Sequence, residues 1–184
     1  ACSGCSLCLL VCPAWHQTRD IRLTPHGRAK AMQHGATASD LATSIASCTL
    51  CGACAPACPE EIDLVGMMLG LRGQQPLAPA QAMTNASLRA HTASTLLLPG
   101  AALRADAARI ARIVALLGRD AAAADDDGSD IALALECGAE AGGERMAAFL
   151  AGMRGATRLI VADGLLHRVL REQLPGMRIQ GLGE

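Results

Sequence analysis

Cysteine residues offer the clearest chemistry in this sequence, because eight of the nine fall in two short repeats. Residues 2–13 read Cys-x-x-Cys-x-x-Cys-x-x-x-Cys-Pro, and residues 48–59 repeat the same spacing. A cubane iron–sulfur cluster takes four thiolates, one for each iron. Three cysteines at three-residue intervals can surround one cluster from a single loop, whereas the fourth, directly before proline, lies too far along the chain and ligates the other cluster. The spacing therefore predicts two 4Fe–4S clusters.

Crossed ligation divides the cysteines into two sets, each drawn from both repeats. The set expected to bind the first cluster comprises Cys2, Cys5, Cys8 and Cys58. The set expected to bind the second cluster comprises Cys48, Cys51, Cys54 and Cys12. Gly4 and Gly52 suit the tight turns that bring backbone N–H groups to cluster sulfurs. Since each repeat serves both clusters, the two clusters should lie close together, as a conduit for electrons requires.

Zinc binding and disulfide bonding are the two other uses of clustered cysteines. Structural zinc sites favour paired Cys-x-x-Cys units with a longer gap between them, which two complete three-plus-one runs do not match. Disulfide frameworks spread their cysteines to join distant loops, but after Cys58 this chain has only Cys137. We expect Cys137 to be a buried apolar residue, with a redox-active thiol as the alternative. Thiolate ligands imply a reducing compartment, so the expected location is cytoplasmic, including the cytoplasmic face of the inner membrane.

Charge and composition exclude several classes of function. The formal net charge is −1, so no basic surface for nucleic acid or an anionic membrane is predicted. One Trp, one Phe and no Tyr leave little aromatic surface on which bases could stack. No apolar run approaches the roughly 20 residues that span a bilayer. Because the chain does not begin with Met and its first cysteine is residue 2, we expect further residues upstream.

Three segments are predicted along the chain. Residues 1–72 carry both cysteine repeats and form the expected two-cluster ferredoxin domain. Residues 73–93 contain two prolines and many small residues, which is typical of a linker. Residues 94–184 alternate apolar runs with helical periods, which predicts a small α/β domain with a parallel sheet. The expected fold class is thus an α-helical ferredoxin domain followed by an α/β domain.

The elements of the α/β segment follow from its apolar pattern. The predicted strands are residues 95–99, 130–135, 158–162 and 177–180. The predicted helices are residues 104–117, 144–153 and 165–174. Asp163 is the expected cap of the last helix. The acidic segment 121–130 is interpreted as a solvated loop, because Ala134 stands where a calcium loop needs a glutamate.

The insert between the two repeats carries more cations than acids. Its four cations and two acids are Arg19, Arg22, Arg28, Lys30, Asp20 and Asp40. A cluster with four thiolates is negatively charged, so this balance is expected to favour the reduced form. The alternative is that these are ordinary surface cations.

The N-terminal part resembles a known family. Small bacterial ferredoxins place their motifs closer together, whereas 35 residues separate Cys12 from Cys48 here. Residues 24–32, TPHGRAKAM, resemble the segment between motifs in iron–sulfur subunits of glycolate oxidase, anaerobic glycerol-3-phosphate dehydrogenase and the heterodisulfide reductase group. Residues 60–64 resemble the continuation of that motif, with Glu61 where Gly is usual. The resemblance implies the α-helical ferredoxin fold.

Residues 94–184 resemble one degenerate copy of the cysteine-rich CCG domain found in those proteins. Residues 98–101 resemble its "FPGC" strand end, with Ala101 in place of Cys. Residues 136–138 resemble "CCG", with Glu136 in place of the first Cys, and Asp163 lies where a further Cys-x-x-Cys would fall. Intact copies bind a cluster or support disulfide chemistry. Since one thiolate cannot anchor a cluster, the resemblance implies that this copy has lost its metal.

The resemblance implies an electron-transfer subunit of an oxidoreductase complex. The expected partners are a flavoprotein dehydrogenase or electron-transfer flavoprotein, and a membrane quinone-linked subunit or another carrier. The sequence has no convincing flavin or nicotinamide fingerprint, so substrate chemistry by the chain alone is not expected. The alternatives are a catalytic subunit of the heterodisulfide reductase type, which the missing cysteines disfavour, and a redox sensor whose clusters control partner binding.

Overall fold

The computed structural model describes residues 1–75, 92–139 and 142–184. These residues form two compact units, one comprising 1–75 with 136–139 and the other comprising 92–135 with 142–184. Most of the linker predicted at 73–93, namely residues 76–91, lies outside the described residues. Within the described ranges, no helix is both long and apolar enough to cross a membrane.

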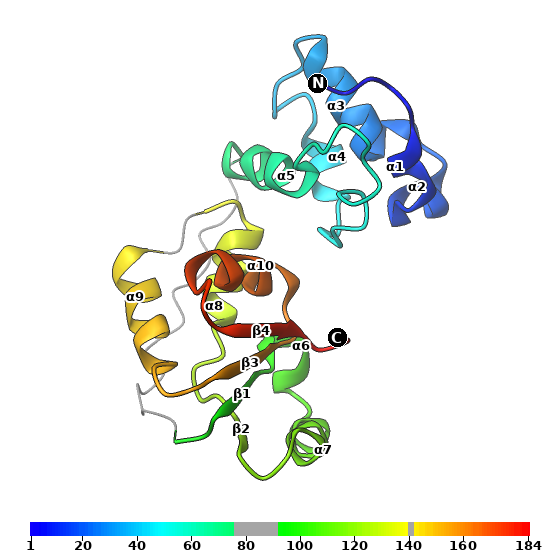
Figure 1. Cartoon of the computed structure of the whole chain (residues 1–184). Coiled ribbons are helices and arrows are strands. Elements are labelled where there is room, and N and C mark those ends of the chain that lie inside the picture. The colour runs from blue at the N-terminus through cyan, green and yellow to red at the C-terminus, as the bar shows by residue number, and fades with distance from the viewer. Residues whose placement is uncertain (76–91, 140–141) are drawn as a thin grey trace. The chain divides into compact units, whose positions relative to one another are not determined.

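The first unit is built from short helices joined by loops (Figure 1). The helices are α1 (Leu7–Leu10), α2 (Pro13–Thr18), the 3-10 helix η1 (Ile21–Leu23), α3 (Pro25–Gln33), α4 (Ala42–Ala46) and α5 (Leu64–Gly73). Proline occupies the first position of α2 and α3, where its missing N–H leaves no hydrogen bond unmade. Thr24 and Asp63 cap α3 and α5 by accepting hydrogen bonds from the N–H groups of Gly27 and Gly66.

The apolar core of this first unit is small. Its buried members are Ala38, Leu41, Ile45, Met68 and Leu71, which come from α4, α5 and the loop before α4. A unit of this size with so few buried apolar side chains gains little stability from hydrophobic burial alone. Outside this cluster, Leu9, Ala29 and Leu64 are also buried, as are the polar residues Thr24 and Arg28.

The second unit contains a four-stranded sheet in which every neighbouring pair is parallel. The strands are β1 (Thr95–Leu98), β2 (Ala121–Ala123), β3 (Arg158–Val161) and β4 (Arg178–Gly181), arranged in the order β2-β1-β3-β4. The helices are α6 (Gly100–Arg104), α7 (Ala107–Leu117), α8 (Ser129–Glu136), α9 (Gly143–Gly152) and α10 (Gly164–Gln173). The predicted combination of a helical N-terminal region with a small parallel-sheet α/β region is confirmed.

The main core of the second unit lies on one face of the sheet. Leu96 and Leu98 of β1 point to that face with Leu159 and Val161 of β3, as the two-residue period of a strand requires. Side chains from α8, α9 and α10 cover them, including Ile131, Phe149, Leu166 and Leu170. Continuous apolar runs in β1 and β3 are therefore explained by burial on both faces, because Leu97 and Ile160 are buried as well.

The predicted strand at 130–135 and the predicted loop at 121–130 are wrong. Residues 130–135 form most of helix α8 instead of a strand. Alanine and leucine favour helices, and the buried pair Ile131 and Ala132 shares a helix face with Leu135, which packs against the core. The second strand is instead the alanine run β2, inside the segment 121–130 that was expected to be a loop.

The predicted helix at 104–117 is divided in two. α6 ends at Arg104, and α7 begins at Ala107 after Asp106, whose side chain accepts a hydrogen bond from Arg109 N. The other predicted strands and helices of this segment are confirmed. Strands β1, β3 and β4 and helices α9 and α10 lie within one residue of the predicted bounds. Asp163 caps α10 by accepting a hydrogen bond from Leu166 N over 2.8 Å.

Candidate metal centre

The cysteines of the two repeats meet at two cavities inside the first unit. One cavity is lined by Cys2, Cys5, Cys8 and Cys58. The other cavity is lined by Cys12, Cys48, Cys51 and Cys54. The structure therefore brings together the four cysteines of each predicted crossed set, and each cavity receives one cysteine from the opposite repeat. We call them the first and the second cavity.

Local structure explains how each cysteine reaches its cavity. Cys8 lies in α1, and Cys12 occupies the N-cap position of α2 directly before Pro13. Cys12 is buried, so the start of α2 points its thiol side inward. In the second repeat the cysteines lie in the loop between α4 and α5. Within the described residues, no three His, Cys, Asp or Glu side chains converge closely enough to hold a single metal ion.

The second cysteine of each repeat lies between two residues with left-handed backbone conformation. Gly4 (φ 90°) and Ser6 (φ 66°) flank Cys5, and Leu50 (φ 52°) and Gly52 (φ 73°) flank Cys51. Alternation of left-handed residues with others turns successive N–H groups to one side of the chain, the nest arrangement found around anions and iron–sulfur sites. The same backbone shape in both repeats is thus suited to a negatively charged group in each cavity.

A shared wall separates the two cavities. Pro25 at the start of α3 and Leu64 at the start of α5 line both of them. His26 and Ala29 of α3 line the first cavity, whereas Arg28 of the same helix lines the second. Helix α3, which comes from the insert between the repeats, therefore faces both sites.

Burial and repulsion from neighbouring negative charges disfavour the thiolate form of two cysteines, Cys8 and Cys54. Burial raises the pKa of the Cys8 thiol, and negative charge at Cys2, Cys5 and Cys58 raises it further. Burial, followed by negative charge at Cys48 and Cys51, raises the pKa of Cys54 to about 11. The metal-free chain thus holds these two thiols protonated at neutral pH, and a metal must displace their protons to bind. The partners that act on Cys8 are the other members of the first crossed set.

Arg28 places a guanidinium in the interior beside the second cavity. Its side chain is 1% exposed, and its Nη1 donates hydrogen bonds to Leu23 O at 3.1 Å, Ser44 O at 2.9 Å and Ser44 Oγ at 3.1 Å. Its Nε is buried without a hydrogen-bond partner. Burial lowers the pKa of Arg28, whereas negative charge at Cys48, Cys12 and Cys54, and to the smallest extent at Cys8 of the first set, raises it. An anion in the second cavity would compensate this buried cation.

The other cations of the insert have partners nearer the surface. Arg22 pairs with Asp20 at 2.7 Å and Arg19 lies over the Trp15 ring. Lys30 Nζ donates to Cys2 O at 3.0 Å. Of the four cations that were expected to favour the reduced form, only Arg28 is fully buried. That expectation is therefore kept for Arg28.

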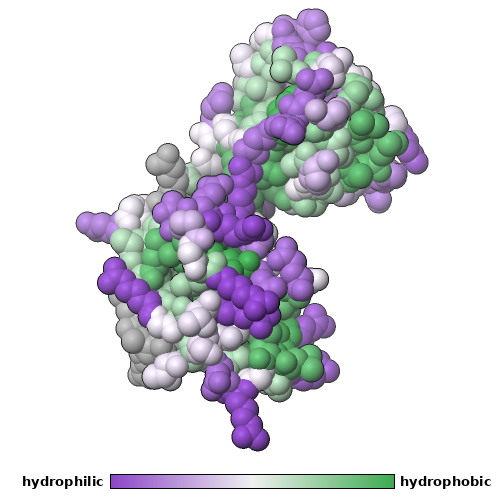
Figure 2. All heavy atoms as spheres, in the orientation of Figure 1, coloured by the Kyte–Doolittle hydropathy of each residue, from purple (hydrophilic) through white to green (hydrophobic). Residues whose placement is uncertain are grey.

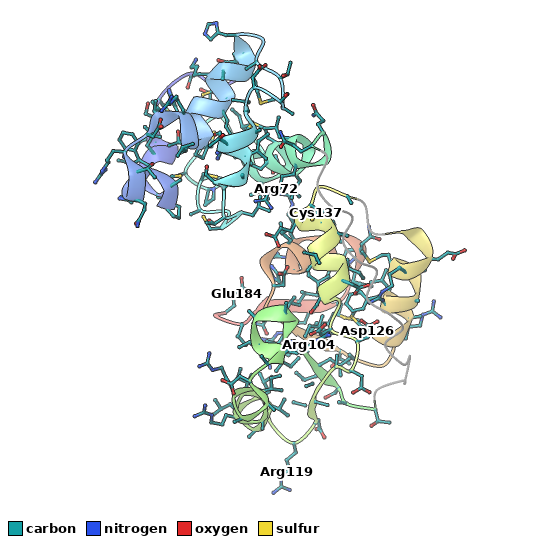
Figure 3. The ribbon with its side chains drawn as sticks, turned by 180° about the vertical axis from the view of Figure 1, so that it is seen from behind. Arg72, Arg104, Arg119, Asp126, Cys137 and Glu184 are labelled. Atoms are coloured by element: carbon teal, nitrogen blue, oxygen red, sulfur yellow. The ribbon has the colours of Figure 1, made fainter. Side chains whose placement is uncertain are left out.

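Helix α5 adds one more polar contact to the second cavity, which sequence reasoning missed. Arg72, labelled in Figure 3, donates from Nη2 to Cys48 O at 2.6 Å. Its Nη1 lies 3.5 Å from the carboxylate of Glu136, a residue of the same unit, so its charge is shared with an acid. Sequence alone gave no signal for this contact, because an arginine at a helix end is usually explained by the helix dipole.

Cys137 lies at neither cavity and is half-buried. Two of the positions where the CCG resemblance lacks cysteine lie in the second unit. Ala101 lies in α6, and Asp163 caps α10. Figure 3 shows Arg104 beside the acidic turn that contains Asp126, where Arg104 forms an ion pair with the buried Asp127. The predicted loss of a metal from this segment stays a prediction.

Comparison with known proteins identifies the cysteine-bearing region only. Residues 1–62 match the sequence model of the 4Fe-4S dicluster domain. No curated protein and no solved structure matches the chain. The match indicates that this region binds 4Fe–4S clusters and, in general terms, transfers electrons. It does not distinguish the narrower group that includes the glycolate oxidase and heterodisulfide reductase subunits, so that resemblance stays a prediction.

The left-handed backbone at Gly52 can be tested by adding one methyl group. A Cβ at Gly52 would lie 3.8 Å from Val65, so Gly52→Ala has space and its cost of about 1 kcal/mol comes from the backbone. Gly70→Ala in α5 is the matched control, because its Cβ meets nothing within 4 Å and alanine favours a helix by about 0.5–1 kcal/mol. We expect Gly52→Ala to lower the urea concentration at which visible cluster absorbance disappears, and Gly70→Ala to leave it unchanged or raise it. Equal midpoints for the two variants would contradict this role of Gly52.

Proposed function

We propose that the first unit binds two 4Fe–4S clusters through crossed ligands. Cys2, Cys5, Cys8 and Cys58 would hold the first cluster, and Cys12, Cys48, Cys51 and Cys54 the second. The observation that carries the proposal is the grouping of four cysteines around each cavity, three from one repeat and one from the other. The domain match at residues 1–62 supports the type of cofactor.

The residues around the cavities fit such a group. Each cavity offers four thiols, the ligand set that a 4Fe–4S cluster takes. The nest-like backbone around Cys5 and Cys51 directs N–H groups toward an anion. Arg28 supplies a buried positive charge beside the second cavity. When bound, each cluster supplies one-electron redox chemistry.

Exposure of the cysteines suits transfer of electrons to and from other molecules. Cys5 of the first set and Cys51 of the second are exposed. Cys8 and Cys54 are half-buried and line the first and the second cavity, which share Pro25 and Leu64 in their walls. Each site thus has one cysteine at the surface, where a partner can approach.

Apolar side chains surround part of this surface. Leu7, Leu10 and Val11, which lie between Cys5 and Cys12 in sequence, are exposed by 44%, 67% and 39%. Figure 2 shows green, apolar surface on the side of the first unit where α1 and α2 lie. Exposed apolar patches of this kind are typical of protein interaction sites.

We also propose which molecules donate electrons to this chain and which accept them. The chain would transfer electrons between a flavoprotein dehydrogenase or electron-transfer flavoprotein and a quinone-linked membrane subunit or another carrier, from a cytoplasmic location. The support is the resemblance of residues 24–32 and 60–64, together with the need of a two-site conduit for a donor and an acceptor. The chain itself would carry out no substrate chemistry, since the CCG-like segment has Ala101, Glu136 and Asp163 in place of cysteines.

Crossed ligation, in which each repeat supplies one cysteine to the other repeat's cluster, can be tested by comparing cysteine variants in pairs. Anaerobically purified protein should contain about eight irons and eight labile sulfides per chain. The EPR spectrum of reduced Cys58→Ser should lose the same signal as that of Cys5→Ser, because both remove a ligand of the first site. Cys12→Ser should match Cys51→Ser for the same reason.

Cys137→Ser is the control and should keep both signals and the full iron content. If Cys58→Ser instead matches Cys51→Ser, the ligands are not crossed. Stoichiometric zinc in place of iron and sulfide would refute the cluster assignment altogether.

The electron-transfer role is tested with a flavoprotein that co-purifies under anaerobic conditions. Adding its substrate should reduce the flavin and then the clusters, seen as new EPR signals at low temperature. Clusters that stay oxidised beside a fully reduced flavin, but are readily reduced by dithionite, would contradict the proposed conduit. A sensor would show cluster-dependent partner binding without rapid reduction.

A further inference from the structure

We propose that Arg28 makes the second site the more easily reduced of the two, so that the first electron taken up by the chain resides at the site of Cys12, Cys48, Cys51 and Cys54. This inference rests on the proposed binding of two clusters. It goes beyond that function by assigning an order to the sites and a residue that sets it.

Arg28 is an unusual cation within the described part of the chain. Arginine is almost never fully buried unless it is paired, yet Arg28 is 1% exposed and forms no ion pair with a carboxylate among the described residues. Asp127, which is also 1% exposed, shows the usual arrangement, because it forms an ion pair with Arg104. The buried charge of Arg28 therefore lacks the counter-ion that a buried charge needs.

Neutral oxygens hold the guanidinium in place without neutralising it. Nη1 binds the carbonyl oxygens of Leu23 and Ser44 and the Ser44 hydroxyl. These contacts tie α3 to α4 and leave Nε buried without a partner. The fold thus fixes a positive charge at the wall of the second cavity, which Cys12, Cys48, Cys51 and Cys54 also line.

The first cavity has no equivalent charge in its wall. Among the described residues, its ionisable lining groups other than cysteine are His26 and Glu60. Lys30 reaches Cys2 O, but its side chain is only half-buried and also binds Gln33 at the surface. Solvent and salt screen such a charge, whereas a buried one acts in a medium of lower dielectric constant.

This asymmetry acts on the reduction step. Reduction of either site adds one electron and one negative charge, with no bond made or broken. The electron comes from the flavoprotein donor of the proposed function, or from dithionite in a titration. A fixed positive charge stabilises the more negative, reduced form, so Arg28 should raise the reduction potential of the second site relative to the first. Electrons that arrive at the first site would then pass to the second.

A potentiometric EPR titration of the full chain tests the order directly. In the wild type, the signal that appears at the higher potential should be the one that Cys51→Ser removes and Cys5→Ser retains. If the higher-potential signal is the one lost in Cys5→Ser, the inference is overturned. This arm requires no change at Arg28, so it holds even if the Arg28 variants do not fold.

Variants of Arg28 test the cause. Arg28→Gln should lower the midpoint potential of the second site clearly more than that of the first, and Arg28→Lys should restore much of the shift by keeping the charge. Arg22→Gln is the control, because the Arg22 side chain is 85% exposed and its loss should move neither potential. With iron content intact, equal shifts at both sites or no shift would overturn the role of Arg28. Absence of clusters from the wild type, measured first as iron and sulfide, would instead refute the proposed function and this inference with it.

Discussion

The structure of the first unit depends on one constraint, which is that each group of four thiols draws its last member from the other repeat. Cys12 and Cys58 each follow three cysteines of their own repeat but line the opposite cavity. The two repeats must therefore lie against one another although 35 residues separate Cys12 from Cys48. Since the apolar core of this unit is small, metal–thiolate bonds would supply much of the cohesion that burial does not.

The insert between the repeats acts as more than a spacer under this constraint. Its helix α3 contributes Pro25 to both cavity walls, and Arg28 to the second alone. Hydrogen bonds from Arg28 to Ser44 attach α3 to α4, the helix that leads into the second repeat. The same side chain thus helps to position the second repeat and places a positive charge beside it, which links the folding of the insert to the electrostatics of the site.

Motif spacing predicted the grouping of the cysteines because a repeat of ligands is a local pattern. Strands β1 and β3 were predictable for the same reason, since each is a short, continuous apolar run. Strand β2 was missed because Ala121–Ala123 has no large apolar or β-branched side chain, and its pairing with β1 is set by tertiary packing. Residues 130–135 were misread because Ile and Leu alternate with Ala there, a pattern that a helix also buries.

Features of the site that depend on long-range packing could not be predicted from the sequence. Glycine signalled only one of the two left-handed positions in each repeat, so Ser6 and Leu50 went unnoticed. Burial of Arg28 could not be predicted either, because arginine is usually exposed and its partner Ser44 lies 16 residues away. The proposed order in which the two sites are reduced rests on that burial, and hence on the structure alone.

The central claim is that two cofactors are held by crossed sets of cysteines. The most direct measurement is a crystal structure of anaerobically purified protein with anomalous data collected at the iron absorption edge. Two separate groups of four iron peaks are expected, one bounded by Cys2, Cys5, Cys8 and Cys58 and the other by Cys12, Cys48, Cys51 and Cys54. A group of iron peaks bounded by the four cysteines of a single repeat, or single-ion peaks in their place, would contradict this claim.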